Sequence, residues 1–341
     1  MIPLLDLPHR EARRLLASGA PAFLTVNPVE YHGPHLSLHN DRLVSLGLVR
    51  DLHQRLLGRH PEWPLLVAAD LEVGVEPCSG PGSRHGRYAL ACELVREACR
   101  ALVELGAQRV VLMTFHGAPL HNHAIEQGVR LLRAAGVHAV APFNLVLAAL
   151  VEPEPEPEPG GGAAIDNGRF APAFAHIADP DERAEMLRTL RLDFHAGFFE
   201  TSVALHYAPE SVSPEHRGLP PCPPFGQLPL LTHAARLARL AGRHALAGEL
   251  GFAAAGLAWY ALRPFPGYTG RPHHATAAAG AHFARFMVDE MAPVVERVLL
   301  GQADSPPPIL SWLRYASLGG RLGGVRLGPS QLLEVPVLAP R

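Results

Sequence analysis

Short hydrophobic runs alternate along the chain with longer segments in which hydrophobic residues recur at helical spacing. The runs read AFLTV (22–26), LLVAA (65–69), RVVLMT (109–114) and VHAVAPF (137–143). Strands of a parallel sheet covered on both faces have this nearly continuous hydrophobicity, because both sides of each strand are buried. The pattern therefore predicts buried parallel strands at these four places.

Two of the segments between these runs predict helices that cover the sheet. Residues 42–57 and 88–105 carry hydrophobic residues at helical spacing, and Gly58 and Gly106 stand where a helix would end. Strands that alternate with helices favour a three-layer α/β/α fold with a mostly parallel central sheet and right-handed crossovers. Ligands of such sheets bind beyond the carboxyl ends of the strands.

The segments after the last predicted strand have other patterns. The sequence EPEPEPEPGGG (152–162) repeats proline and acidic residues, which predicts an exposed loop without helix or strand. Residues 283–300 predict a helix that bends at Pro293. The final segment, 304–341, is rich in proline and glycine, and its leucine and tryptophan residues must pack on the body or on a neighbouring subunit. We therefore expect one domain over residues 1–303, followed by a C-terminal arm.

The composition of the 341 residues excludes several classes of function. The formal net charge is −2, which gives no basic surface for nucleic acid or anionic lipid. All 30 basic residues are arginine, and the absence of lysine excludes Schiff-base catalysis and the phosphate loop of P-loop NTPases. A small, neutral molecule is therefore the expected partner.

The cysteines and the apolar segments indicate the compartment. Cys92 and Cys99 are seven residues apart in a helical pattern, which predicts packing in the core rather than a disulfide. The first residues, MIPLLDLPHREARR, do not have the pattern of a signal peptide. The longest uncharged apolar stretches, such as residues 250–262, are shorter than the ~20 residues that a membrane span requires. We expect a cytoplasmic protein that does not bind membranes.

A first cluster of ionisable residues lies at the end of the first predicted strand, in the sequence VEYHGPHLSLHND (29–41). If the strand continues, Glu30 and His32 point to the same side, because alternate residues of a strand share a face. A carboxylate and an imidazole together suit zinc, manganese or iron. Asp41 begins the next helical pattern, where it either caps the helix or, if Asn40 caps instead, is available to a metal.

A second cluster follows the strand RVVLMT, in the sequence FHGAPLHNH (115–123). His116 lies where a parallel sheet presents its ligands and is the best candidate for a metal ligand. His121 and His123 are predicted to lie in a polar loop at the start of the next helix.

A third cluster is DFHAGFFETS (193–202), in which His195 precedes Glu200. A glutamate in a first helical turn is also stabilised by the helix dipole without any catalytic role. Neither a GxSxG serine nor a cysteine lies in the three clusters. Carboxylates and imidazoles without a thiolate are typical of a two-metal hydrolytic centre, in which a shared carboxylate bridges the ions.

The order of these motifs resembles the creatininase (creatinine amidohydrolase) family. The opening signature of that family is roughly E-x-H-G-P-H-L-P-x-x-x-D, and its other motifs follow in the same order over about residues 20–300. The matching segments are EYHGPHLSLHND (30–41), PGS (81–83), HGA (116–118), HAGFFETS (195–202) and GYTGRPHHAT (267–276). The first and fourth of these motifs are specific, and the others are weak when taken alone.

The resemblance implies a role for each candidate residue. The ligands of a binuclear metal site would be Glu30, His32, Asp41, His116 and Glu200, with Asp41 as the bridge, and His195 would transfer protons. The chain departs from the family pattern at Ser37, Ala118 and Phe198. Creatininase itself takes a ligand from the loop that contains Ala118, which the methyl side chain of alanine cannot supply.

The resemblance also implies the activity. We expect a metal-dependent amidohydrolase that holds two divalent ions (zinc, manganese or iron) and cleaves a non-peptide or cyclic amide through an activated water. Some relatives hydrolyse formamide-type precursors and others trim a peptide, so those substrates stay open. A non-catalytic metal- or ligand-binding protein on the same scaffold is the alternative. By analogy with the family, the chain is expected to form a homo-oligomer.

Overall fold

A parallel sheet forms the centre of the computed structural model, which describes residues 1–151, 169–321 and 326–333. The strands are β1 (Ile2–Pro3), β2 (Ala22–Asn27), β3 (Leu66–Glu72), β4 (Arg109–Met113) and β5 (His138–Val140). They are parallel and lie in the order β1-β3-β2-β4-β5. All six residues of β2 are buried, because this strand lies in the middle of the sheet between β3 and β4.

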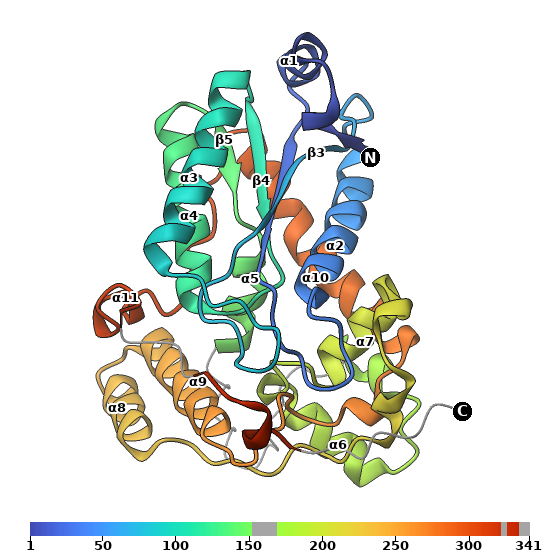
Figure 1. Cartoon of the computed structure of the whole chain (residues 1–341), viewed down its shortest axis with the longest axis vertical. Coiled ribbons are helices and arrows are strands. Elements are labelled where there is room, and N and C mark those ends of the chain that lie inside the picture. The colour runs from blue at the N-terminus through green and yellow to red at the C-terminus, as the bar shows by residue number, and fades with distance from the viewer. Residues whose placement is uncertain (152–168, 322–325, 334–341) are drawn as a thin grey trace.

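Helices cover both faces of the sheet (Figure 1). One face carries α2 (Asn40–Leu57) and α10 (Ala277–Leu299), and the other carries α3 (Tyr88–Leu105) and α4 (Pro119–Ala134). The predicted α/β fold with a parallel central sheet is therefore confirmed. Gly106 ends α3 in the left-handed conformation with φ 99°, which explains why a glycine stands there.

Two predicted boundaries were wrong. The run VHAVAPF was predicted to be a strand, but β5 stops at Val140, and a new helix, α5 (Phe143–Val151), begins just after Pro142. Proline cannot donate a hydrogen bond to the sheet, and it favours a turn into the helix. The last long helix, α10, begins at Ala277, six residues before the predicted start. It contains Pro293 as expected.

The helices of the second half of the chain lie mostly below the carboxyl ends of the strands in Figure 1. The long apolar stretch, residues 250–262, lies largely within one of these helices, α9 (His244–Tyr260). None of the helices in the described ranges has the length and hydrophobicity to cross a membrane. The remaining helices are α1 (His9–Ala17), α6 (Pro180–Arg188), α7 (Phe198–Tyr207), α8 (Pro229–Leu240), α9 (His244–Tyr260) and α11 (Leu313–Ala316).

The described part of the C-terminal segment packs on the body of the same chain. Leu310 is buried in the main hydrophobic core. The Trp312 indole Nε1–H and the Leu310 backbone N–H both donate to the Glu249 carboxylate of α9. The segment 152–162, which was predicted to be an exposed loop, lies outside the described residues. The two predicted core cysteines, Cys92 and Cys99, are buried in α3 and do not form a disulfide.

Candidate metal centre

The loops that follow β2, β3 and β4 meet beyond the carboxyl ends of these strands (Figure 1). The neighbours of the central strand β2 are β3 on one side and β4 on the other, and the chain reaches them by separate crossovers. The carboxyl end of β2 is therefore at a topological switch point of the sheet. Three of the predicted site residues, Glu30, His32 and His116, lie in the loops after β2 and β4. The other three predicted residues come from the start of α2 and from the segment around the start of α7.

Glu30, Asp41 and His116 form one group whose ligand atoms all lie within 4.8 Å of one another. The His116 Nδ1 atom lies 2.8 Å from Glu30 Oε2 and 3.6 Å from Asp41 Oδ2. The opposite ring nitrogen of His116, Nε2, donates to the backbone carbonyl of Val75 at 3.1 Å. This contact holds the ring with the lone pair of Nδ1 directed at the two carboxylates, an arrangement typical of metal-binding histidines.

His32, His195 and Glu200 form a second group of the same kind. The His32 Nδ1–H donates to the Glu30 backbone carbonyl at 3.1 Å, so Nε2 carries the lone pair that faces the carboxylates. His32 Nε2 lies 3.3 Å from Asp41 Oδ1 and 3.6 Å from Glu200 Oε1. The other oxygen of Glu200, Oε2, accepts the backbone N–H of Ala196.

Asp41 lies between the two groups. Its Oδ1 atom faces His32 and its Oδ2 atom faces His116. Both oxygens are buried and have no hydrogen-bond partner among the described residues. Asp41 therefore does not cap α2, which begins at Asn40 without a side-chain cap. The interpretation of Asp41 or Asn40 as the cap is wrong.

The distances in the centre fit divalent transition metals. Two ligands that are each about 2.1 Å from an ion lie about 3.0 Å apart in octahedral and about 3.4 Å apart in tetrahedral geometry. The separations between facing ligand atoms here are 2.8–3.6 Å. Glu30 Oε2 and both oxygens of Asp41 are buried without a hydrogen-bond partner among the described residues. Carboxylate oxygens in such a place need a cation.

The charges of the centre also favour positive ions. Burial opposes protonation of His116, but the adjacent Glu30 carboxylate outweighs burial and raises the pKa of His116 to about 9. Burial also opposes protonation of His32, and the carboxylates of Asp41 and Glu200 again prevail and raise its pKa well above the usual value. In the protein without metal, the two imidazoles thus attract protons to the places that metal ions would take.

His195 differs from the other two histidines. Burial and the neighbouring His32 lower the pKa of His195, so its neutral form is favoured. Its Nε2–H donates to the backbone carbonyl of Tyr31 at 3.0 Å, which leaves the lone pair on Nδ1, 4.0 Å from Glu200 Oε2. The backbone of His195 is held by three hydrogen bonds with Thr269. A neutral imidazole held in this way can accept and return a proton.

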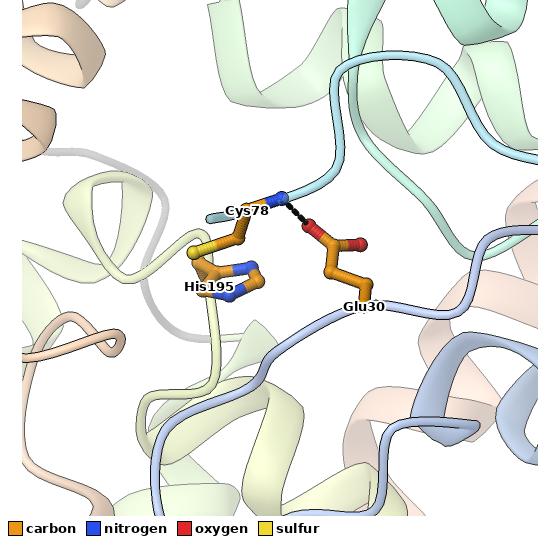
Figure 2. Close-up of side chains that lie close together, drawn as sticks. All are labelled: Glu30, Cys78 and His195. Atoms are coloured by element: carbon orange, nitrogen blue, oxygen red, sulfur yellow. Dashed lines mark hydrogen bonds between the residues drawn. The ribbon is translucent and has the colours of Figure 1, made fainter. Parts of the chain in front are cut away.

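Cys78 is a member of the site that sequence reasoning missed. Its backbone N–H donates to Glu30 Oε1 at 2.5 Å, and its side chain lies beside the His195 ring (Figure 2). Glu30, Cys78 and His195 have ligand atoms within 4.8 Å of one another. No cysteine lies within the three sequence clusters, but the fold brings Cys78 beside them from a fourth segment. The signal that could have found Cys78 is its position in the loop after β3, between the strand and the PGS motif.

His121 and His123 lie in the first turns of α4, and both are buried, so the prediction of a polar loop is wrong. His121 Nε2 lies 3.1 Å from the Val26 carbonyl, and its ring packs against His116. Neither histidine belongs to a possible metal-binding group within the described part of the chain. His121 therefore supports a proposed ligand rather than being one.

A cavity of about 210 Å³ opens onto the centre. Its walls carry seven aromatic side chains, and Glu76, Ala118 and Pro119 also line it. The aromatic residues are Phe115, Phe143, Phe194, Phe199, Phe252, Trp259 and Tyr260. A small organic molecule in this cavity would contact both the predicted metal ligands and His195.

Comparisons with known proteins show the family and the fold to which this chain is similar. A family model described as creatininase, creatinine amidohydrolase, matches residues 6–295. A search of curated proteins gave no match. Several solved structures share the fold at low sequence identity.

One solved structure is a creatinine amidohydrolase (creatininase) with 20% identity and a TM-score of 0.50, covering 87% of this chain and 97% of the other. Another, a mutant creatininase of the Zn-Zn type, has 18% identity and a TM-score of 0.52, with 87% and 98% covered. A putative creatinine amidohydrolase from Bacteroides fragilis NCTC 9343 has 17% identity and a TM-score of 0.50, with 83% and 90% covered.

Proposed function

The chain belongs to the creatininase family, and from this membership we propose that it is a metal-dependent amidohydrolase that cleaves the C–N bond of a small non-peptide or cyclic amide. The observation that carries the proposal is the position of Asp41, whose two oxygens face two separate sets of ligands. One set adds Glu30 and His116, and the other adds His32 and Glu200.

The donors of both sets are carboxylate oxygens and imidazole nitrogens, which suit zinc, manganese or iron. The shared fold of a creatininase variant of the Zn-Zn type supports zinc as the first ion to test. When bound, two such ions would polarise an amide carbonyl and lower the pKa of a bound water molecule.

The protein groups supply the proton transfer. His195 Nδ1 faces the centre and is not used by the hydrogen bond to Tyr31, so it can accept a proton as water attacks the carbonyl carbon. The same atom then gives the proton to the departing nitrogen. An amide nitrogen leaves as a neutral amine far more easily than as an anion, which is why the reaction needs this transfer.

The proposal is tested by replacing Asp41 with alanine and measuring metal per chain and turnover together. We expect the wild type to hold two ions per chain and to hydrolyse at least one member of a panel of small amides and lactams. The D41A variant should lose both properties. D181A, which changes an exposed aspartate of α6, is the control and should keep both. Retention of both ions by D41A would refute the bridging role.

A non-catalytic binding protein is the second candidate, and Ala118 is the observation that favours it. Ala118 lines the cavity with a methyl group where creatininase itself takes a ligand, so either Glu200 completes the second ligand set or that set binds its ion more weakly. One ion or none per chain, together with no turnover on the panel, would favour the binding protein. We also propose that the enzyme is cytoplasmic and, by family analogy, that it forms a homo-oligomer. Light scattering of the purified chain would test the oligomer.

A further inference from the structure

Glu76 is a carboxylate on the cavity wall that the proposed mechanism does not use. It lies in the loop after β3, is one of the residues that line the cavity, and is exposed. It belongs to none of the groups whose ligand atoms lie within 4.8 Å of one another in the described part of the chain. The other three carboxylates on the wall, Glu30, Asp41 and Glu200, are all proposed metal ligands.

The backbone and the side chain of Glu76 are both held in place. Its φ is +56°, a left-handed conformation that is uncommon for a residue other than glycine, and strained residues of this kind cluster at functional sites. Its Oε2 atom accepts the backbone N–H of Leu120 at 3.2 Å, in the first turn of α4. This hydrogen bond fixes the direction of the carboxylate, while the side chain stays open to the cavity.

The other walls of the cavity suit a positive group. Seven aromatic side chains line it, and aromatic faces attract cations as well as apolar groups. The chain has 30 basic residues, all arginine, yet none is among the described residues that line the cavity. Apart from the imidazoles of the metal centre, no cationic side chain is among the described residues that line the cavity. A negative group bound away from the centre would therefore find no cationic partner, and it would meet the Glu76 carboxylate.

We infer that Glu76 is a substrate-binding residue, and that the substrate of this enzyme is a small amide with a cationic group on an apolar body. The inference rests on the proposed function, because it names the substrate class of the same site. Partial desolvation of the Glu76 carboxyl group by neighbouring protein atoms raises its pKa. A cation bound beside Glu76 would offset this effect by stabilising the carboxylate. The substrate would then be charged, in contrast to the neutral partner expected from the sequence.

Binding is measured first, because it does not depend on turnover. The probes are cyclohexylammonium and its neutral counterpart cyclohexanol, titrated by calorimetry into the zinc-loaded protein. We expect the wild type to bind the ammonium at least about tenfold more tightly, which corresponds to about 1.4 kcal/mol. The E76Q variant keeps an oxygen for the Leu120 N–H but loses the charge. It should lose this preference and keep its affinity for cyclohexanol and its metal content.

Turnover is measured next with ε-caprolactam and α-amino-ε-caprolactam, which differ by one cationic amine. E76Q should raise KM for the cationic lactam at least about tenfold, with little change in kcat or in activity on the neutral lactam. E76D should restore part of the difference. The control is E72Q, because Glu72 lies at the end of β3 but is exposed outside the cavity and pairs with His39 and Arg84.

The outcomes separate the two proposals. If neither lactam is cleaved but E76Q abolishes selective ammonium binding, the cation site stands and the amidohydrolase assignment needs another substrate. If the wild type binds both probes equally, or if E76Q weakens both equally, Glu76 is not a cation-binding residue. Loss of metal from E76Q would instead make Glu76 part of the metal centre and overturn the inference.

Discussion

Three histidines of the centre each donate one ring N–H to a backbone carbonyl, and this contact determines which nitrogen faces the cavity. For His32 the facing atom is Nε2, whereas for His116 and His195 it is Nδ1. Because each ring is held by the backbone, its direction follows from the path of a loop. Sequence motifs identified these histidines, but the nitrogen that each presents depends on carbonyls that only the fold brings near.

Replacement of His195 by alanine tests its role in proton transfer. We expect kcat to fall about 10²- to 10⁴-fold, the range typical of a lost general acid or base, while the metal content stays at the wild-type level. Activity assays and metal analysis on the same sample measure both quantities. H206A, which changes an exposed histidine of α7, is the control. If H195A loses metal, His195 is a ligand of the second set and not the proton carrier.

His123 is expected to limit the stability of the protein in acid. Its ring is buried in α4 without a hydrogen-bond partner among the described residues, and burial, together with Arg314 and Arg130, lowers its pKa to about 4. The unfolded chain binds this proton at about pH 6.5, whereas the folded protein binds it only near pH 4. Stability is therefore lost as the pH falls from about 6.5 to about 4, by at most about 3 kcal/mol.

Denaturant unfolding of the variant H123L across this pH range checks the prediction. The apolar side chain removes the titrating group, so the variant should lose less stability than the wild type between pH 6.5 and pH 4. H244L changes an exposed histidine of α9 and should keep the wild-type slope. Equal slopes for H123L and the wild type would show that another group causes the loss.

At the scale of elements, the strands and the first helices were predictable, and most of the second half of the chain was not. The strands of a covered parallel sheet are hydrophobic on both sides, and this pattern is visible in the sequence. Helix α9 is rich in alanine and apolar residues on every side, so it lacks the stripe that marks a surface helix. The loop after β3 carries Glu76 and Cys78 into the site, and no periodic pattern marks such a loop.

The contact between α7 and α10 is expected to determine the position of Glu200. A Cβ atom on Gly280 of α10 would lie 1.8 Å from the Ser202 carbonyl oxygen of α7, so only glycine permits this approach. The added methyl group of the G280A variant should push the two helices apart. The variant should therefore lose about 1–3 kcal/mol of folding free energy. Because α7 carries Glu200, metal affinity should fall as well.

Gly251 supplies the matched control for this substitution. It lies inside α9, and apart from the adjoining residues of its own helix, no atom of the described residues lies within 4 Å of an added Cβ. G251A should therefore gain up to about 1 kcal/mol of stability, because alanine is the better helix former. Thermal unfolding and zinc titration compare the two variants. A G280A protein as stable as G251A would contradict the close-packing interpretation.

At the scale of the whole molecule, the strand order explains why residues so distant in sequence meet. Because β2 lies between β3 and β4, the loops after these three strands share one edge of the sheet, and the segment before α7 closes it from the other side. The sequence predicted that the three clusters would converge, and the structure places Glu30, Asp41 and His116 beside His32, His195 and Glu200. The sequence could not indicate the aromatic cavity, because its aromatic side chains come from the loop after β4, the segment before α7, and helices α5, α7 and α9.

The most direct test of the account is a crystal structure of the zinc-loaded protein with anomalous diffraction at the zinc edge. The account predicts two anomalous peaks per chain on opposite sides of the Asp41 carboxylate. One peak should lie against Glu30 and His116, and the other against His32 and Glu200. A single peak, or two peaks that do not share Asp41, would contradict the proposed binuclear centre and the hydrolytic mechanism that depends on it.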